Sequence, residues 1–459
     1  MTRPRKVVLA YSGGLDTSII VPWLRDRYGC EVVCYCSDVG QGAELEGLEA
    51  RARAIGASEV FVEDLRKPFL EEFCFPALRA GAVYEGRYLL GTSLARPLIA
   101  ARQVACARAV GADALAHGCT GKGNDQVRFE LTWRALAPDL AVIAPWREWD
   151  ITSREDALRY AAQHGVPVAQ TSADLFSRDG NLWHLSHEGG PLEDPANAPP
   201  ESMHKLTAGA STRPSRPARV AIGFESGTPV SLDGETLDPV TLVIKLNELA
   251  GVHGVGRADL VESRTVGMKS RGVYETPAGT VLMEALEDLC RLVLPHDLLR
   301  TRLELAPRMA DLIYAGLWFT PLRESLQAFA DKALEPATGE VTVELFQGQA
   351  RALARTSPMS LYQADLASFD MTGYDARDAA GFIRLFGLPL AVAAQRDKTA
   401  VAVPLGGATN GGATPSEREA SHGITVPADA TDAEDAVTAL ATDDVPGSLA
   451  PDGVELSSR

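Results

Sequence analysis

The stretch YSGGLDTS at residues 11–18 comes directly after the apolar run at residues 7–10. Glycines at the end of a strand let backbone N–H groups approach a ligand, because glycine has no Cβ and tolerates positive φ. A helix that begins there adds unpaired N–H donors and the positive end of its dipole. Ser12, Thr17 and Ser18 supply hydroxyls at the same place. The stretch predicts an anion-binding loop, for example for nucleotide phosphates; a strand-to-helix turn without a ligand is the alternative.

Short β-rich runs alternate with helical runs in the first third of the chain. We expect strands at residues 6–10, 31–37, 59–63, 114–117 and 140–144, with helices at residues 17–28, 43–55 and 153–164. Thr152 and Glu155 have the spacing of a capping box for the last helix. This alternation predicts an α/β fold, a doubly wound parallel sheet that binds ligands at the carboxyl ends of its strands.

The second half of the chain has a different pattern. Six prolines in residues 188–217 predict a long loop, and the turn Ser226–Gly227 lies between two alternating runs that form a hairpin. Further helices are expected around 242–250, 281–294 and within 295–334, and a strand pair at 341–354. We predict a first domain at residues 1–168, a second, α+β domain at residues 169–398, and a tail at residues 399–459.

The composition excludes some classes of function. The net charge of −17 disfavours a nucleic-acid partner, because phosphate binding requires basic surface. No apolar run approaches the ~20 residues of a membrane span. Seven cysteines without a CxxC pair indicate a reducing compartment, and we expect a cytoplasmic protein. Residues 405–459 hold ten acidic residues against two arginines, and no aromatic residue follows Gly387, so we predict a disordered acidic tail.

A second glycine loop, GCTGKGNDQVRFE at residues 118–130, also follows an apolar strand. Lys122 is a cation between glycines. Asn124 and Arg128 are four residues apart, so they share a helix face. An amide and a guanidinium on one face suit a substrate that carries a carboxylate. A polar helix N-terminus without a ligand is the alternative.

The first loop is neither a Walker loop nor a GxGxxG fingerprint. It resembles the loop of the ATP pyrophosphatases, which include asparagine synthetases, GMP-forming amidotransferases, NAD synthetases and tRNA thiolases. Six motifs in order make the resemblance specific, because together they are similar to the argininosuccinate synthase family over about residues 6–390. They are YSGGLDTS, RYLLGTSLARP, HGCTGKGNDQVRFE, IAPWR, NLWHLSHEGG and GMKSRGVYETPAGT.

The resemblance implies an enzyme of arginine biosynthesis that joins citrulline to aspartate through citrullyl-adenylate, releasing AMP and pyrophosphate. It implies ATP with Mg²⁺ as substrate, no prosthetic group, no resident metal and a homotetramer in which an apolar stripe at Ala379, Phe382, Ile383 and Phe386 docks on neighbouring subunits. The implied ATP-binding residues are Ala10, Tyr11, Ser12, Gly13, Gly14, Leu15, Asp16, Thr17, Ser18, Ser37 and Gly118. Citrulline would be held by Tyr88, Ser93, Asn124, Arg128, Ser177, Ser186, Glu262 and Tyr274, and aspartate by Thr120, Asn124 and Asp125.

Several assignments stay open at this point. Asp16 is either a neighbour of Mg²⁺ or a helix cap. Lys122 is expected to stabilise charge on the phosphates. His184 and His187 have the spacing of a metal pair, but no cysteine or acid completes a site. A tRNA-thiolating enzyme and a nucleotide sensor without catalysis are the other classes of function, and the acidic charge and the intact second loop speak against them.

Overall fold

The first strand of the chain, β1 (Lys6–Ala10), lies at the centre of a parallel sheet in the computed structural model. The structure describes residues 3–121, 123–167, 175–367, 373 and 375–397. The chain divides into a main unit, residues 1–374, and a second unit, residues 375–459. Within the described residues no helix is long and apolar enough to cross a membrane.

The parallel sheet has the strand order β3-β2-β1-β4-β5, and all its pairings are parallel. The chain winds first to one side of β1 and then to the other, so the order reverses between β1 and β4. Ligands bind at such a switch point, outside the carboxyl ends of the strands. The predicted doubly wound sheet is confirmed, and its other strands are β2 (Glu31–Asp38), β3 (Glu59–Asp64), β4 (Ala114–Ala116) and β5 (Ala141–Ile143).

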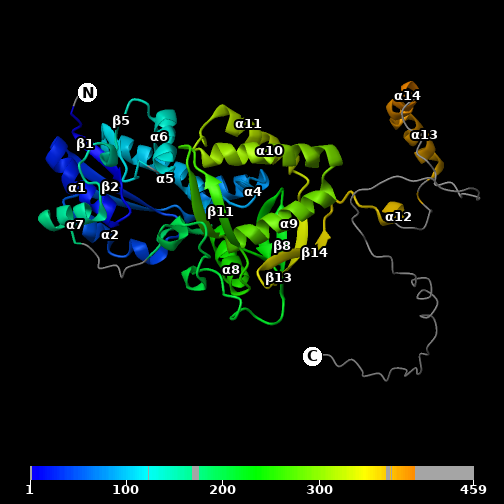
Figure 1. The fold of residues 1–459 in the computed structure, drawn as a ribbon, viewed down its shortest axis with the longest axis horizontal. Coiled ribbons are helices and arrows are strands. Elements are labelled where there is room, and N and C mark those ends of the chain that lie inside the picture. The colour runs from blue at the N-terminus through cyan, green and yellow to red at the C-terminus, as the bar shows by residue number, and fades with distance from the viewer. Residues whose placement is uncertain (1–2, 122, 168–174, 368–372, 374, 398–459) are drawn as a thin grey trace, which may run out of the picture. The chain divides into compact units, whose positions relative to one another are not determined.

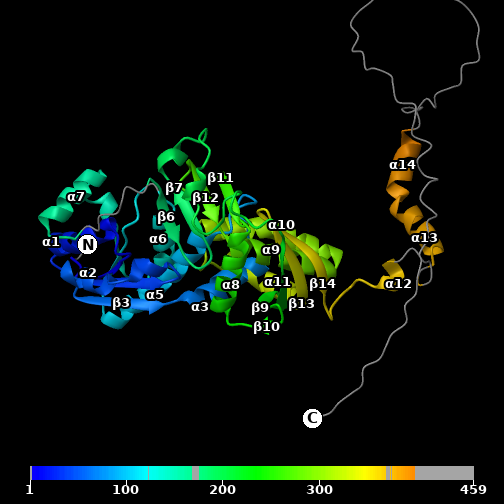
Figure 2. The same ribbon diagram turned by 90° about the horizontal axis from the view of Figure 1, so that it is seen from below.

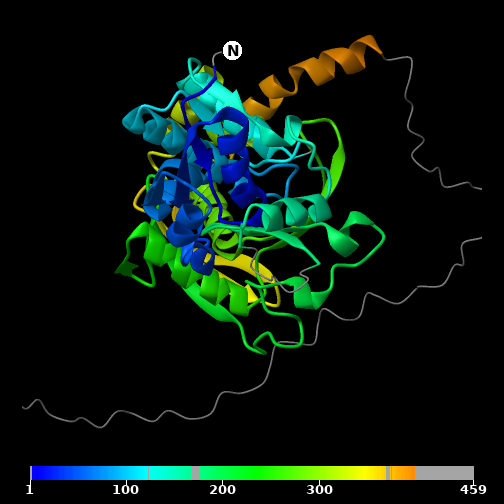
Figure 3. The same ribbon diagram turned by 90° about the vertical axis from the view of Figure 1, so that its left-hand side faces the viewer.

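Helices cover both faces of this sheet because successive strand residues point to opposite sides. Val7 and Leu9 pack with α1 (Leu15–Tyr28) and α7 (Arg154–Gln163), whereas Val8 packs with α5 (Gly91–Val110) and α6 (Asp125–Leu136). Figure 1 shows these elements in blue and cyan, and in Figure 3 the blue elements face the viewer. Figure 2 shows α1 beside α7. Cys34 and Cys36 are both buried on the α1 face, as their spacing predicts.

Two predicted details of this half are wrong. The helix expected at residues 43–55 is a short 3₁₀ turn, Gly42–Leu45, followed by α2 (Leu48–Ala54), because Gly47 adopts a left-handed conformation with φ +65°. The capping box is one residue later than predicted. Ser153 Oγ accepts a hydrogen bond from the Asp156 N–H at 3.1 Å, and the Asp156 carboxylate accepts one from the Ser153 N–H at 3.1 Å.

The second half contains an antiparallel sheet of order β10-β9-β8-β13-β14, which includes the two predicted strand pairs. The register pairs β13 with both β14 and β8. Helices α8 and α9 pack on this sheet. The bounds are β8 Ala218–Glu225, β9 Thr228–Leu232, β10 Glu235–Thr236, α8 Pro239–Val252, α9 Pro277–Val293, β13 Gly339–Phe346 and β14 Gln349–Thr356.

A four-stranded antiparallel sheet of order β11-β12-β7-β6 was not predicted from the sequence. Its strands are β6 (Ser177–Gly180), β7 (Leu185–Glu188), β11 (Arg257–Ser263) and β12 (Lys269–Glu275). The strands β6 and β7 are four residues long and rich in charged and hydroxyl side chains, so they lack the apolar alternation that marks a strand. The long loop predicted at residues 188–217 follows β7 and contains two short 3₁₀ turns, Gly190–Glu193 and Glu201–Met203.

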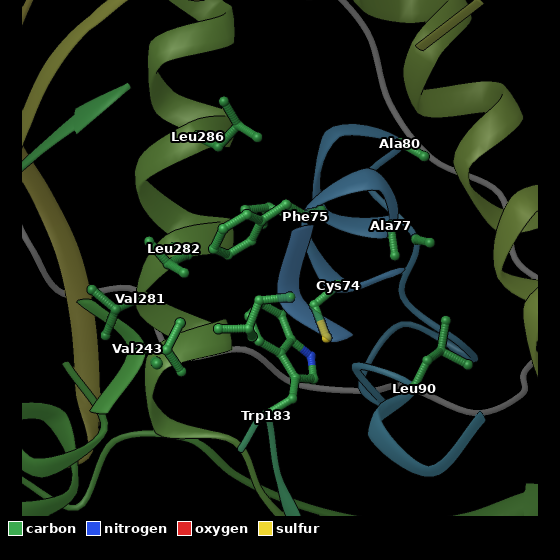
Figure 4. Close-up of a cluster of buried hydrophobic side chains, with 14 of the residues drawn as sticks. Cys74, Phe75, Ala77, Ala80, Leu90, Trp183, Val243, Val281, Leu282 and Leu286 are labelled. Atoms are coloured by element: carbon green, nitrogen blue, oxygen red, sulfur yellow. The ribbon is translucent and has the colours of Figure 1, made fainter. Parts of the chain in front are cut away.

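The largest hydrophobic core joins segments that are far apart in the sequence. Phe75 on α4 (Phe75–Arg79) packs toward Leu282 and Leu286 on α9, and Trp183 lies near Val243 of α8 and Val281 of α9 (Figure 4). Other helical segments surround this core or connect its parts: α3 Arg66–Pro68, a π-helical turn Phe69–Cys74, α10 His296–Tyr314 and α11 Pro321–Ala333. The short helix α12 (Ala364–Ala367) is exposed, and a 3₁₀ turn, Pro145–Arg147, follows β5.

The second unit contains the helices α13 (Arg377–Phe386) and α14 (Leu388–Arg396). The Asp375 carboxylate accepts a hydrogen bond from the Arg377 N–H at 3.0 Å at the start of α13. Phe382 and Phe386 stack at 5.2 Å, and both are more than 60% exposed. The predicted stripe is therefore an exposed apolar face. The predicted tail at residues 399–459 lies outside the described residues.

Candidate active site

The first glycine loop leaves β1 at Tyr11 and enters α1 at Leu15. Gly13 has φ +78°, which side chains rarely adopt, so a residue without Cβ is required there. The hydroxyls of Ser12 and Thr17 lie 3.1 Å apart, and Thr17 Oγ1 also donates to the Gly14 carbonyl at 3.3 Å. Gly14 is the N-cap residue of α1, and no side chain accepts a capping hydrogen bond at this end of the helix. The N–H groups of the first turn of α1 are thus available to an anion, as the sequence predicts.

The second loop follows β4 and meets the first loop at Gly118. A Cβ on Gly118 would lie 2.8 Å from Thr17 Cγ2, so glycine lets the second loop pack against α1. His117, the residue before it, is buried; its Nδ1 accepts a hydrogen bond from the Cys119 N–H at 3.2 Å, and its Nε2 lies 3.1 Å from Glu130 Oε1. These contacts fix the exit of β4 beside the exit of β1.

A cavity of about 270 Å³ opens between the two loops, at the carboxyl ends of β1, β2 and β4. Its lining combines polar groups with the apolar side chains of Val39, Ile99 and Phe129. Six of the residues predicted to bind ATP line it: Ala10, Tyr11, Ser12, Thr17, Ser37 and Gly118.

A second cavity, of about 480 Å³, adjoins the first, and six residues line both: Ser12, Glu44, Arg96, Cys119, Asp125 and Asp179. All the residues predicted to bind citrulline or aspartate line this cavity except Ser93. They are Tyr88, Thr120, Asn124, Asp125, Arg128, Ser177, Ser186, Glu262 and Tyr274, and Asp16 of the first loop is also present. The unpredicted four-stranded sheet supplies four of them, one from each strand: Ser177, Ser186, Glu262 and Tyr274.

Glu262 is a buried carboxylate with a phenol on each oxygen. The Tyr274 hydroxyl donates to Oε2 at 2.7 Å, and the Tyr314 hydroxyl donates to Oε1 at 2.6 Å. Tyr314 also accepts a hydrogen bond from Asn124 Nδ2 at 2.9 Å, and Tyr88 stacks on Tyr274 at 4.1 Å. Burial, followed by the nearby Glu262 charge, raises the pKa of Tyr314, so its phenol stays protonated and donates.

Asp125 lies between two arginines. Arg96 Nε and Arg128 Nη1 each donate to its carboxylate at 2.8 Å. Burial alone would raise the pKa of Asp125, but the charges of Arg96 and Arg128 lower it, so the group is ionised. Arg96 also pairs with Asp179 at 2.8 Å. These contacts give a charged cluster at the boundary of the two cavities.

The structure separates a few predicted residues from the cavities. Four residues of the first loop and the start of α1 line neither cavity: Gly13, Gly14, Leu15 and Ser18. The Ser18 side chain is buried, and its hydroxyl lies 3.1 Å from the Tyr11 hydroxyl. Ser93 is fully buried on α5 and lines neither cavity. Lys122 lies outside the described residues.

Sequence reasoning missed three groups at the site, Arg96, Asp179 and Tyr314. Arg96 is within the motif RYLLGTSLARP, and that motif was the only signal for it. Asp179 has no local pattern that marks it. Tyr314 ends α10, about 190 residues after its partner Asn124, so only the fold brings the two together.

The histidines of the motif NLWHLSHEGG do not form a metal pair. His184 Nε2 lies 3.0 Å from Thr92 Oγ1, whereas His187 accepts a hydrogen bond from Arg178 Nε at 3.1 Å and contacts Glu275 at 2.8 Å. Within the described residues, His187, His204 and Glu275 are near enough to share an ion. Glu275, however, also accepts three backbone N–H bonds, from Lys205, Leu206 and Thr207, at 2.8 to 2.9 Å. Those donors satisfy the carboxylate, so this cluster anchors the 204–207 loop to β12.

Comparison with known proteins gives matches over most of the chain. The model of the arginosuccinate synthase N-terminal HUP domain matches residues 6–167, and the model of the arginosuccinate synthase C-terminal domain matches residues 176–393. A chloroplastic argininosuccinate synthase of Arabidopsis thaliana is 56% identical over 86% of this chain and 80% of its own length. Argininosuccinate synthases of a Roseiflexus species and of Carboxydothermus hydrogenoformans are 58% and 57% identical, over 85% and 86% of this chain and 96% and 98% of their own lengths.

Proposed function

The chain belongs to the argininosuccinate synthase family of arginine biosynthesis, and we propose that it ligates L-citrulline to L-aspartate in two steps that consume ATP. The observation that supports this proposal best is the pair of adjoining cavities. One has loops suited to phosphates and an apolar part suited to a base, and the other has paired charges suited to amino acids. A phosphate and a citrulline side chain would meet at the shared lining, which includes the hydroxyl of Ser12 and the guanidinium of Arg96.

In the first step, the ureido oxygen of citrulline attacks the α-phosphorus of ATP. The new oxygen–phosphorus bond forms as the bond to the β,γ-pyrophosphate breaks, giving citrullyl-adenylate and pyrophosphate. The loop at residues 10–18, with Ser37 and Gly118, would hold ATP. Its backbone N–H groups and the α1 dipole stabilise charge on the leaving pyrophosphate. Lys122 would add a cation there.

Mg²⁺ that accompanies ATP would neutralise part of the phosphate charge. Asp16 is suited to approach it, because its carboxylate is exposed at the cavity and the N-cap of α1 has no side-chain hydrogen bond. Of the two roles left open for Asp16, this one fits better than a helix cap.

In the second step, the amine of aspartate attacks the ureido carbon of the adenylate, AMP leaves, and the amine loses a proton to give argininosuccinate. Thr120, Asn124 and Asp125 would hold aspartate. Asn124 and Arg128 would hold citrulline, and Glu262 with Tyr274 would pair with its ammonium group, since a desolvated ammonium needs a carboxylate partner. The described contacts use two of the five N–H groups of Arg128, so its guanidinium retains donors for a substrate carboxylate.

Citrulline would also contact Tyr88, Ser177 and Ser186, which line the same cavity. Ser93 is buried in α5, so its role would be to support Tyr88 from below the cavity surface. We further propose a homotetramer that forms through the exposed stripe of α13, a cytoplasmic location, and the domain division at residues 168–169. The free cysteines are consistent with a reducing compartment.

The experiment that tests the function supplies the purified protein with ATP, Mg²⁺, citrulline and aspartate. We expect argininosuccinate, AMP and pyrophosphate in equal amounts, with pyrophosphate formed only when citrulline is present. ADP as the nucleotide product would contradict the proposal. Pyrophosphate formation with tRNA in place of citrulline would favour a thiolating enzyme, and ATP binding without any product would favour a nucleotide sensor.

A further inference from the structure

Tyr314 is the last residue of α10 and is 2% exposed. The described residues that line the larger cavity do not include it. It nevertheless contacts three residues that do: Asn124, Arg128 and Glu262. Asn124 lies at the start of α6, Arg128 lies in the first turns of α6, and Glu262 lies on β11. Tyr314 of α10 therefore joins α6 and β11 at the site.

The hydroxyl of Tyr314 makes two hydrogen bonds to groups that line the cavity. It accepts from Asn124 Nδ2 at 2.9 Å and donates to Glu262 Oε1 at 2.6 Å. The Asn124 carbonyl oxygen accepts from the Thr265 N–H at 3.0 Å, so both ends of the amide are fixed and its orientation is determined. The buried hydroxyl oxygen of Tyr314 thus links the side-chain amide of Asn124 to the carboxylate of Glu262.

The rest of Tyr314 fixes Arg128. The Tyr314 carbonyl accepts a hydrogen bond from Arg128 Nε at 3.0 Å, and the guanidinium carbon lies 5.0 Å from the centre of the ring. The ring stacks on Tyr84 at 3.7 Å. A Cβ on Gly316 would lie 2.7 Å from Arg128 Cα, so α6 contacts the end of α10 directly, without an intervening side chain.

We propose that Tyr314 is a positioning residue for the citrulline site, and that its hydroxyl orients Asn124 and Glu262 for the substrate. The inference rests on the proposed function, because it takes citrulline as the ligand of those two residues. A buried hydroxyl that holds two substrate-binding groups in place lowers the reorganisation that binding would otherwise require.

The test is Tyr314→Phe, which keeps the ring, its stack on Tyr84 and the carbonyl contact, and removes the hydroxyl alone. We expect the KM for citrulline to rise about 10- to 100-fold. The KM for ATP should stay within about twofold, because no contact of Tyr314 reaches the first glycine loop. The matched control is Tyr28→Phe, which also removes a phenol hydrogen bond to a carboxylate, that of Glu148, but away from both cavities. The KM values of this control for citrulline, aspartate and ATP should match those of the unaltered protein.

An unchanged KM for citrulline in a folded Tyr314→Phe variant would overturn the inference. So would a fall in Tm with equal changes in all three KM values, because that pattern indicates a structural role. If the variant does not fold, a crystal structure of the unaltered protein with citrulline decides: the hydroxyl should keep both bonds while Asn124 and Glu262 contact citrulline. Loss of either bond, or citrulline bound elsewhere, would overturn the inference. Failure of the unaltered protein to make argininosuccinate would refute the proposed function instead.

Discussion

At the scale of single residues, the site and its surroundings depend on buried carboxylates that are compensated in different ways. Asp125 is compensated by two guanidinium groups, Glu262 by two phenols, and Glu275 by a histidine and backbone N–H groups. A buried charge without such partners is strongly destabilising. The first two carboxylates line the larger cavity and keep capacity for a substrate, whereas Glu275 is occupied entirely by its own chain.

Replacing Arg128 by leucine tests the substrate assignment. The change removes the donors that we assign to the citrulline carboxylate, so citrulline affinity should fall by about 10- to 150-fold. Because Arg128 also pairs with Asp125, aspartate binding should weaken as well. ATP binding, measured by calorimetry without citrulline, should change much less. Lost ATP binding with unchanged citrulline binding would show that the residue roles are wrong.

Replacing Glu275 by glutamine tests the anchor of the 204–207 loop. Burial alone would raise the pKa of Glu275, but hydrogen bonds from His187, Thr207 and Lys205 lower it to about 2. The ionised group therefore contributes stability above its unfolded pKa of about 4.5, and this contribution is lost as the pH falls toward 2. At pH 7 the variant should lose about 3 kcal/mol of unfolding free energy in urea denaturation.

The difference in unfolding free energy between the unaltered protein and Glu275→Gln should become smaller below pH 4.5. The control is Glu304→Gln, which breaks an exposed pair with Arg300 and should cost under about 1 kcal/mol at any pH. A difference that stays constant from pH 7 to pH 3 would contradict the assigned ionisation.

At the scale of elements, the two glycine loops need their glycines for different reasons. Gly13 needs its positive φ, and Gly118 needs the space beside Thr17. Gly14 has neither constraint, since its φ is −74° and the nearest atom to an added Cβ is Ser12 Oγ at 3.6 Å. A side chain at Gly14 is therefore compatible with the fold and affects chiefly what approaches the loop.

Gly14→Val should therefore still fold, with a loss of up to about 1 kcal/mol because valine is a poorer N-cap than glycine, yet bind ATP at least 10-fold more weakly, because the side chain crowds the approach of the phosphates. Gly13→Val should cost roughly 1–2 kcal/mol of unfolding free energy as well, since valine is strained at positive φ. Calorimetric titration with ATP and urea denaturation measure the two effects. Unchanged ATP affinity in Gly14→Val would place the phosphates elsewhere.

At the scale of the whole molecule, the residues that line the two cavities and the exposed apolar helices belong to different units. Every residue that lines the two cavities is in the main unit, whereas Phe382, Ile383 and Phe386 are in the second unit. An apolar helix face of this kind is covered in a stable protein, and a second copy of the chain is the occupant we propose.

Two truncations separate the stripe from the tail. Ending the chain after Gly406 removes no aromatic residue and no motif, so activity, Tm and mass by light scattering should barely change. Ending it after Tyr374 removes the stripe too, and the tetramer should give way to smaller species in light scattering. A tetramer that survives the second truncation would show that other surfaces hold it.

The sequence alone predicted the parallel sheet, the two glycine loops that follow its strands, and the family. Those features depend on local patterns: a strand of residues 6–10 that ends on glycines, a second loop at residues 118–130, and six motifs in fixed order. Boundaries failed by a residue or two where neighbouring groups compete, as Ser153 and Thr152 do for the helix cap. Tyr274, inside a motif, and Glu262, outside all six, were assigned to the site because the resemblance named them.

The hydrogen-bond and ion-pair partners of the site residues became known only from the tertiary structure. The four-stranded sheet was missed because its short polar strands are stabilised by pairing between segments up to about 90 residues apart, and not by an apolar alternation of their own. The partners Arg96–Asp179 and Tyr314–Asn124 have the same origin, since each joins elements distant in the sequence. Hydrogen bonds and ion pairs act over about 3 Å in space, whatever the separation along the chain, and a sequence pattern reports only on residues a few positions apart.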